Sequence, residues 1–318
     1  MKKSFASPRL VMSAIFLLLS AYCLLPSAYC LLRSDDARLL ETGGAAKAAA
    51  APSNGELKVV SYNMRYRAGE DLKRVVELLR SDPEVGGSAV IGLQEVDRNK
   101  KRTGHTNTAR AMAEALGMNY VWAAPPNARP KDGEQKRGGE EEEETGVAIL
   151  SPYPLTDVAR IVLAHEGPNR RRRAAIGATV RVGDVSLRVY SVHAETRMPV
   201  AKKVEHWGAV LEDLRRHPHV RHVVVLGDFN TIKGKDVRAA RRLFTGAGFH
   251  TPFPDSEETF KVLFLDFKLD WIWLRGLKAG DYGIDKEIGL SDHWPLWAKV
   301  KLDMQSAPSL TALPTSLK

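Results

Sequence analysis

The chain has 318 residues, of which 44% are hydrophobic and 27% are charged, a composition typical of a soluble globular protein. Its only two cysteines, Cys23 and Cys30, lie in an N-terminal apolar segment, which excludes disulfides, thiolate catalysis and cysteine-bound zinc from the rest of the chain. The formal net charge of +9 favours anionic partners such as nucleic acid or phospholipid headgroups, although a merely soluble basic surface explains it equally well.

The N-terminal segment contains a long apolar run, residues 10–32, which is preceded by Lys2, Lys3 and Arg9. About 20 apolar residues allow a helix to cross a bilayer, and the basic flank predicts that the remainder of the chain is translocated. A cleaved signal peptide has a shorter apolar core and small residues at its cleavage site. We therefore favour a signal-anchor over a signal peptide for residues 1–33. The remainder is expected outside the cytoplasm, held at the membrane, or secreted or periplasmic if the segment is cleaved.

Three further segments lack the periodicity of regular structure. Residues 34–56 are rich in Gly, Ala, Pro and Ser and predict a flexible linker. Residues 127–145 contain five consecutive glutamates, which predict a mobile, solvated acidic loop because like charges repel. The tail, residues 303–318, is predicted to be disordered. These boundaries leave residues 57–302 as the main domain.

Within this domain, short apolar runs typical of strands alternate with segments of helical periodicity. The predicted strands are residues 57–62, 89–93, 147–150, 176–182, 185–192, 223–226, 271–274 and 296–300, and the predicted helices are 72–79, 109–116, 201–216 and 236–247. Gly183-Asp184 predicts a hairpin between two of the strands. The mixture predicts one α/β (α+β) domain in which helices cover the sheets.

Polar side chains gather where predicted strands end, a position from which a rigid element can present functional groups. They are Asn63, Glu95, His193, Asp228, Asn230 and Asp292. Each also has an ordinary explanation. Asn63 can be a turn residue, Glu95 a solvated charge, and Asp228 with Asn230 an Asx-turn.

Five short motifs occur in a fixed order along the domain. They are Ser61-Tyr62-Asn63, Gln94-Glu95, Val192-His193, Gly227-Asp228-Phe229-Asn230 and Ser291-Asp292-His293. Together they resemble the motif series of the endonuclease/exonuclease/phosphatase superfamily, which includes deoxyribonuclease I, exonuclease III, bacterial sphingomyelinases and inositol polyphosphate 5-phosphatases. Each motif alone is common, but the series covers nearly all of residues 57–301. The resemblance implies a four-layer α/β/β/α sandwich similar to deoxyribonuclease I, and hydrolysis of phosphoester bonds.

The implied chemistry needs a cation on the non-bridging phosphate oxygens, an oriented water and a proton source for the leaving alkoxide. Oxygen ligands suit Mg²⁺, which uses only one or two carboxylates. The resemblance implies Mg²⁺ (or Mn²⁺) with Glu95 as ligand and Asn63 beside it, and Asp292 is a third candidate ligand.

The resemblance also implies the catalytic groups. Asp228 and Asn230 are similar to the pair that orients the attacking water and binds the phosphate. His293 is similar to the histidine that stabilises the pentacovalent phosphate or acts as general base, and Asp270 to the aspartate that pairs with it and would raise its pKa. His193 matches the proposed general acid of the deoxyribonuclease I and sphingomyelinase branches. Which histidine is the acid is left open.

Substrate-side residues are less clearly matched. Arg173, the last residue of the basic run 170–173, resembles an arginine near the substrate phosphate, although a solvated basic loop also explains the run. Many family members have Asn-Thr-His-Leu around the position of His193, which this chain lacks. The Arg and Gln common on the next helix are also absent, and Lys202, Lys203 and His206 are their candidate replacements. The histidines at 105, 165, 217 and 219 are expected on the surface.

The leading hypothesis is a metal-dependent phosphodiesterase, with nucleic acid as the favoured substrate. A phospholipid headgroup, as in sphingomyelinases, and a small phosphoester are the alternatives. No aromatic-rich hairpin suited to membrane insertion is evident in the sequence, which favours nucleic acid or a soluble phosphoester over a phospholipid. A catalytically dead module that binds phosphate ligands is the non-enzyme alternative, and the retained acidic and histidine positions argue against it. We predict a monomer without a protein partner.

Overall fold

The computed structural model describes residues 37–44, 49–126 and 143–302. The predicted anchor, most of the acidic loop and the predicted tail lie outside the described residues. The chain divides into two compact units, residues 1–41 and 42–318. The second contains the helices and all strands of the two large sheets except the beginning of the strand Leu40–Gly43. No helix within the described ranges is both long and apolar enough to span a membrane.

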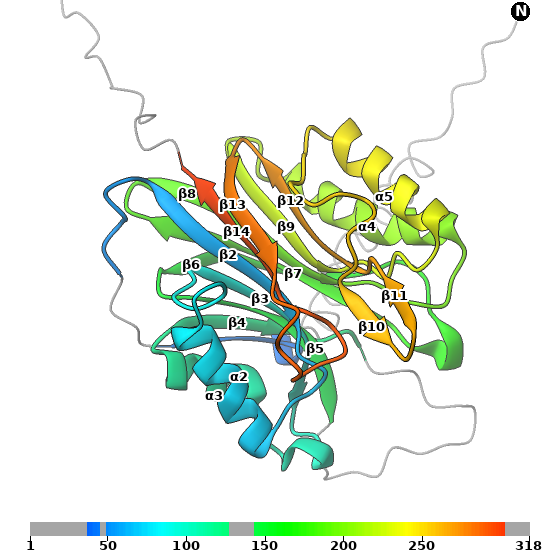
Figure 1. Ribbon diagram of the computed structural model, residues 1–318, viewed down its shortest axis with the longest axis horizontal. Helices are drawn as coiled ribbons and strands as arrows, with labels where there is room; N and C mark the ends of the chain where they lie inside the picture. Colours follow the sequence, from blue (N-terminus) through cyan, green and yellow to red (C-terminus); the bar gives the residue numbers. More distant parts are fainter. Residues whose placement is uncertain (1–36, 45–48, 127–142, 303–318) are drawn as a thin grey trace, which may run out of the picture. The chain divides into compact units, whose positions relative to one another are not determined.

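The first large sheet has seven strands in the order β1-β4-β5-β3-β2-β14-β13 (Figure 1). Their bounds are β1 Leu40–Gly43, β2 Glu56–Asn63, β3 Val90–Arg98, β4 Asn119–Ala123, β5 Glu144–Ser151, β13 Lys278–Ile284 and β14 Leu296–Lys301. β2 and β3 are parallel, and their carboxyl ends therefore lie at the same edge of the sheet. The other pairs for which strand partners are given, β3 with β5, β4 with β5, β2 with β14 and β13 with β14, are antiparallel.

The second large sheet has five strands in the order β12-β9-β8-β7-β6. Their bounds are β6 Leu155–Val162, β7 Ala174–Val182, β8 Val185–His193, β9 His222–Asp228 and β12 Asp270–Arg275. β8 and β9 are the parallel pair here, while the remaining neighbours are antiparallel. A separate hairpin, β10 Phe260–Val262 and β11 Leu265–Phe267, precedes β12.

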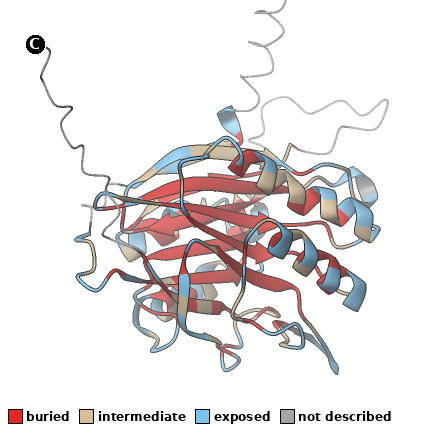
Figure 2. Ribbon diagram, turned by 90° about the horizontal axis from the view of Figure 1, so that it is seen from above, coloured by how far each residue is buried: buried red, intermediate tan, exposed pale blue. Residues whose placement is uncertain are grey.

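The two sheets pack face to face, since β3 and β5 contact β8, and β2 contacts β9. Helices α2 Gly69–Ser81 and α3 Thr108–Leu116 cover the first sheet, and α4 Val200–Leu214 and α5 Gly234–Gly246 cover the second. Figure 2 shows the buried strands between the partly exposed helices. This arrangement confirms the four-layer α/β/β/α sandwich. Short 3₁₀ turns at Lys101–Thr103 and Pro168–Arg170 complete the regular structure of the described residues.

The helices form where the sequence repeats apolar residues at spacings of three and four. In α5, Val237, Ala240 and Phe244 are buried because this spacing places them on one face of the helix. Phe244 stacks on Trp273 of β12 with ring centroids 5.0 Å apart, and the same core contains Trp207 and Val210 of α4. Burial of such side chains stabilises the fold by about 1.5–3 kcal/mol each.

All four predicted helices and all eight predicted strands are present, and the predicted turn at Gly183-Asp184 joins β7 to β8. Strands β1, β4, β6, β10, β11 and β13 were not predicted, and several predicted boundaries differ from those observed. Residues 40–43 form a strand inside the predicted linker, and β3 continues past Leu93 to Arg98. Glu144, predicted to be a solvated loop residue, is buried in β5 and pairs with Arg98. An oppositely charged neighbour across the sheet accounts for the burial of that glutamate.

The β10–β11 hairpin was not predicted from the sequence. It is not an aromatic-rich hairpin, but its turn exposes consecutive apolar side chains, with Leu263 84% and Phe264 83% exposed. Its strands have only three residues each, too few to show a period of two. Its turn lacks the Asn-Gly or Asp-Gly signal of common hairpins.

Lys268, which follows the hairpin, is buried without a hydrogen-bond partner for Nζ among the described residues. Its ammonium group lies 4.3 Å from the ring centroid of Trp271. Burial lowers the pKa of Lys268 to about 8, against the opposing charges of Glu257 and Asp255. The folded state therefore releases the Lys268 proton at a lower pH than the unfolded chain does. Between pH 8 and the normal pKa of lysine the unfolded chain binds more protons here, so stability rises with pH across that window.

Substituting Lys268→Met is therefore expected to raise the free energy of unfolding at pH 7 by about 1–2 kcal/mol, because the penalty for burying the charge exceeds the lost cation–π contact. The rise in stability above pH 8 should also become smaller. Urea unfolding at pH 7 and pH 10 measures both effects, with the exposed Lys278→Met as control. A less stable Lys268→Met protein at pH 7 would contradict this account.

Candidate active site

The carboxylate of Asp228, the last residue of β9, is the centre of a buried polar cluster between the two sheets. Three side chains approach its Oδ2 atom: Asn63 Nδ2 at 3.1 Å, His193 Nε2 at 3.6 Å and His293 Nε2 at 3.8 Å. Its Oδ1 accepts a hydrogen bond from the backbone N–H of Asn230 at 2.9 Å. Burial raises the pKa of Asp228 to about 7, although the charge of His293 opposes the shift.

Gly227 lets the chain reach this cluster. Its φ is +133°, and a Cβ atom there would overlap the backbone carbonyl of Val192 on β8. Glycine is therefore required by both conformation and space. Because β8 and β9 are parallel, their last residues, His193 and Asp228, are register partners, and the two side chains meet at one edge of the second sheet.

Glu95 reaches the site through an irregularity in β3. The register with β5 shifts between Gln94 and Val96, so Glu95 is the extra residue of a β-bulge, and its φ of 56° is left-handed. A left-handed non-glycine residue costs about 1–2 kcal/mol, and bulges often re-aim a side chain beside an active site. The carboxylate is 25% exposed and its Oε1 lies 3.9 Å from His193 Nε2. No described residue donates a hydrogen bond to it.

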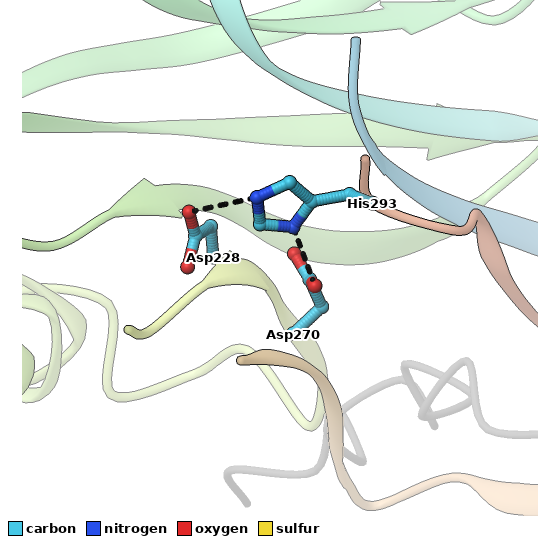
Figure 3. Close-up of side chains that lie close together, drawn as sticks. All are labelled: Asp228, Asp270 and His293. Atoms are coloured by element: carbon cyan, nitrogen blue, oxygen red, sulfur yellow. Dashed lines mark hydrogen bonds and ion pairs between the residues drawn. The ribbon is translucent and has the colours of Figure 1, made fainter. Parts of the chain in front are cut away.

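His293 lies in the loop between β13 and β14 and is buried against two carboxylates (Figure 3). Its Nδ1 donates a hydrogen bond to Asp270 Oδ2 at 2.8 Å, which leaves Nε2 facing Asp228. Burial by itself would lower the pKa of His293, but the charges of Asp270 and Asp228 outweigh it and raise the pKa to about 9. The imidazole is therefore positively charged at neutral pH.

Thr259 orients Asp270. The Thr259 hydroxyl accepts hydrogen bonds from the backbone N–H groups of Leu269 and Asp270, both at 2.9 Å, and donates one to Asp270 Oδ2 at 2.8 Å. The same carboxylate oxygen thus binds Thr259 and His293. Atoms of Asp228, Asp270 and His293 lie within 4.8 Å of one another and could also hold a metal ion, but the hydrogen bond between Asp270 and His293 already uses two of these groups.

His193 is held from behind by Arg173. The guanidinium Nη1 of Arg173 lies 3.2 Å from His193 Nδ1, and since a guanidinium can only donate, Nδ1 accepts and the imidazole proton is on Nε2. That N–H points toward Asp228 and Glu95. Burial, together with the positive charges of Arg173, His293 and Arg171, holds the pKa of His193 well below its usual value, so this histidine is neutral.

Glu195, two residues after His193, is fully buried and binds both arginines of this part of the site. Its Oε1 lies 2.7 Å from Arg171 Nη2, and its Oε2 lies 3.2 Å from Arg173 Nε. Burial acts to raise the pKa of Glu195, but hydrogen bonding to Arg171 and the charge of Arg173 lower it. Glu195 therefore fixes Arg173, which in turn fixes the tautomer of His193.

A cavity of about 210 Å³ opens beside His193. Its lining includes four cationic side chains, Lys100, Arg171, Arg172 and Arg173. Among the described residues of its lining, Glu143 is the single acidic side chain. The cavity is therefore suited to an anionic group placed next to the cluster around Asp228.

The other predicted site residues lie around this cluster. Asn63 Oδ1 accepts a hydrogen bond from Arg65 N at 3.1 Å, which directs its amide nitrogen toward Asp228. Asn230 has a left-handed φ of 53°, and its Nδ2 donates a hydrogen bond to Ala194 O. The backbone at Asn230 is therefore not extended as it would be in a continuing strand. Asp292 lies in the loop before β14, not after a strand, and pairs with Arg65 at 3.0 Å. The catalytic and ligand roles of all these residues stay predictions.

On the helix after His193, Lys203 and His206 contact the site from behind, while Lys202 is exposed. Lys203 Nζ donates to Asn230 O at 2.6 Å and to Asp236 Oδ2 at 3.0 Å, and His206 Nδ1 accepts from Glu195 N at 3.5 Å. These residues thus hold the loops that carry the site. The remaining predicted surface histidines are exposed or half-buried, as expected, at positions 105, 165, 217 and 219.

Two positioning residues were missed by the sequence analysis, Glu195 and Thr259. Glu195 follows a recognised motif by two positions but has no local signal that separates it from a solvated glutamate. Thr259 is 11 residues from Asp270, across the hairpin. No spacing rule connects them, because their contact exists only once the hairpin has folded.

Comparison with solved structures shows the same fold. An endonuclease/exonuclease/phosphatase from Beutenbergia cavernae DSM 12333 is 17% identical, with a TM-score of 0.61, and the match covers 78% of this chain and 72% of that one. ANGEL2, a 2',3'-cyclic phosphatase, is 15% identical with a TM-score of 0.58, covering 80% and 97%. The human Nocturnin catalytic domain with bound sulfate is 16% identical with a TM-score of 0.57, covering 79% and 95%.

No curated protein matches the chain. Residues 60–293, however, match the model of the family described as "Endonuclease/Exonuclease/phosphatase family". This span includes the five motifs and all the side chains gathered around Asp228. The chain therefore belongs to the endonuclease/exonuclease/phosphatase family, whose members are phosphoester hydrolases.

Proposed function

We propose that this protein is a divalent-metal-dependent phosphodiesterase in which Asp228 orients and deprotonates the attacking water. The observation that carries the proposal is the convergence of Asn63, His193 and His293 on one buried oxygen of Asp228. A carboxylate with a pKa raised to about 7 by burial is matched to proton transfer near neutral pH. A purely structural Asx-turn at this position would not need two histidines.

The remaining groups handle charge and the leaving group. The water oxygen forms a bond to phosphorus, its proton passes to Asp228, and one P–O ester bond breaks. The leaving alkoxide takes up the equivalent of the proton that the water released. His293, kept positively charged by Asp270, stabilises the negative charge that develops on the phosphate. His193, whose proton lies on Nε2, donates a hydrogen bond to a phosphate oxygen or to the leaving alkoxide. Because His193 is neutral, its N–H serves as a donor without prior protonation.

The donor set around the cluster fits Mg²⁺ or Mn²⁺, because it consists of carboxylate and amide oxygens. We propose Glu95 as the principal ligand, since its bulge aims a partly exposed carboxylate at the site. Asn63 Oδ1 has one lone pair left beside its bond to Arg65, and Asp292, already paired with Arg65, is the least free candidate. When bound, such an ion would polarise the phosphate and neutralise part of its charge.

The basic cavity beside His193 supports a diester substrate over a monoester. A phosphodiester carries a second substituent beyond the scissile bond, and the cavity offers space and cationic side chains, Arg171 and Arg172 among them, for an anionic part of it. Nucleic acid and phospholipid headgroups both meet this requirement, and the pocket alone does not choose between them.

The test is hydrolysis of bis-p-nitrophenyl phosphate by the purified full chain. We expect turnover with Mg²⁺ or Mn²⁺, complete loss with excess EDTA, and recovery when the metal is restored. The monoester p-nitrophenyl phosphate serves as the comparison and should react more slowly. Turnover that persists in EDTA would contradict the metal requirement, and preference for the monoester would make the protein a phosphomonoesterase.

A further inference from the structure

The turn of the β10–β11 hairpin concentrates exposed apolar surface. Four consecutive side chains are exposed there: Val262 by 42%, Leu263 by 84%, Phe264 by 83% and Leu265 by 48%. They are four of the six exposed large apolar side chains among the described residues. Scattered exposed apolar residues are normal, but a contiguous group at a turn marks an interaction surface.

The base of this hairpin is joined to the catalytic cluster. Phe260 forms an isolated antiparallel bridge with His293, and their ring centroids are 4.7 Å apart. Lys261 N donates to Asp292 O at 3.0 Å, and Thr259 holds Asp270. A molecule bound at the turn is therefore held at a fixed position relative to the catalytic cluster.

The hairpin is long enough to span a lipid headgroup layer. Phe264 lies four residues beyond Phe260, which corresponds to about 13 Å of extended strand. The headgroup region on each side of a bilayer is about 5–8 Å thick. A turn inserted at the boundary of the acyl chains would thus cross the headgroup layer, with the base of the hairpin and His293 on the aqueous side of that layer.

The charge around the turn favours a lipid surface over nucleic acid. Lys261 and Asp266 are cross-strand partners below the turn, so the hairpin tip has no net positive charge. Nucleic-acid surfaces combine aromatic side chains with Lys and Arg, whereas this turn combines one aromatic with three aliphatic side chains. A turn that carries aliphatic and aromatic side chains and no net charge is suited to insertion between lipid headgroups, at the boundary with the acyl chains.

We propose that the β10–β11 turn inserts into the surface of a phospholipid bilayer and that the substrate is the phosphodiester of a phospholipid headgroup. This rests on the phosphodiesterase function proposed above. The apolar run at residues 10–32, which we propose as a membrane anchor, would keep the domain at the same surface. Hydrolysis breaks one P–O ester bond of the headgroup phosphate, and water supplies the new oxygen and the proton.

The test compares two double variants of residues 37–318, which keep the whole of β1 and lack the apolar run, and a cooperative urea unfolding transition first establishes that each protein is folded. Leu263→Ser/Phe264→Ser removes the tip, and Val162→Ser/Tyr282→Ser removes an aliphatic and an aromatic side chain exposed elsewhere. Flotation with phosphatidylcholine vesicles, with and without phosphatidylglycerol, measures binding. We expect the tip variant to bind at least about tenfold more weakly than the wild type and the control variant to bind normally.

Activity assays distinguish the molecules that could bind to the turn. Release of phosphorylated headgroup from vesicles should fall in parallel with binding in the tip variant, while hydrolysis of bis-p-nitrophenyl phosphate should be unchanged in both variants. Equal vesicle binding and hydrolysis by both variants would overturn the proposal. So would plasmid DNA cleavage without vesicle binding, or self-association in light scattering that disappears in the tip variant while vesicles are ignored. Vesicle binding that depends on the tip, with no hydrolysis of any diester, would refute the phosphodiesterase function and leave the docking surface intact.

Discussion

Replacing Asp228 by asparagine is expected to lower kcat/KM for bis-p-nitrophenyl phosphate by about 1,000-fold. Asparagine has the same shape and can still accept the N–H of Asn230, so the loop should keep its conformation. It cannot take a proton from water, however. The loss should therefore fall mainly on kcat, and stopped or continuous assays at saturating metal will show it.

Stability provides the second half of this prediction. Because burial raises the pKa of Asp228 to about 7, its folded form prefers to be neutral, and stability falls as the pH rises from the usual pKa of aspartate toward 7. A neutral asparagine avoids that cost. In the absence of metal, Asp228→Asn should be at least as stable as the wild type at pH 8. A well-folded and fully active Asp228→Asn protein would contradict the proposed mechanism.

Asp213 offers a matched control, since it is a buried aspartate outside the site. It accepts hydrogen bonds from Arg188 Nη2 and Tyr190 OH, both at 2.9 Å. Asp213→Asn leaves Arg188 with no full counter-charge and should cost about 3 kcal/mol of stability while kcat at 25 °C is preserved. The two substitutions should thus have opposite effects on activity and stability.

The second large effect is expected for Asp270→Asn, with a loss of about 100-fold in kcat. Asp270 fixes the proton of His293 on Nδ1 and its charge, with that of Asp228, raises the pKa of His293 to about 9 against the opposite effect of burial. In the wild type, the charge on His293 is present below that pKa and lost above it. Removing the Asp270 charge lowers the pKa, so the alkaline limb of the pH–rate profile should move to lower pH.

Thr259→Val is the control for this second prediction. It removes the hydroxyl that orients Asp270 but keeps the carboxylate charge. We expect a smaller loss of kcat and an alkaline limb close to that of the wild type. An unmoved alkaline limb in Asp270→Asn would show that the charge on His293 does not limit the reaction.

Much of the fold could be predicted because its signals are local. The helical spacing of Val237, Ala240 and Phe244 and the apolar run before Asp228 each depend only on neighbouring residues. The residues brought together around Asp228 were likewise marked by short motifs at strand ends. β13 was missed because it is mostly exposed, and a half-polar edge strand has no apolar run to detect.

The roles of charged residues were less predictable. Glu144 and Glu195 look like solvated glutamates in the sequence, yet both are buried against arginines. Lys203 is one of three candidates on its helix in the sequence, and only its contacts with Asp236 and the carbonyl of Asn230 show that it is buried. A charge can be buried only where a distant segment supplies its partner, and that segment is not identified by local spacing.

By itself the sequence determined the family, the layers and the residues at the centre of the site, because apolar periodicity and ordered motifs are properties of the linear chain. Only the tertiary structure decided that Glu95 lies on a bulge, that Arg173 sets the proton on His193, and that the hairpin whose base contacts His293 exposes Leu263 and Phe264 at its turn. Each of these depends on which distant segments pack together. Burial, ion pairing and exposure are consequences of that packing.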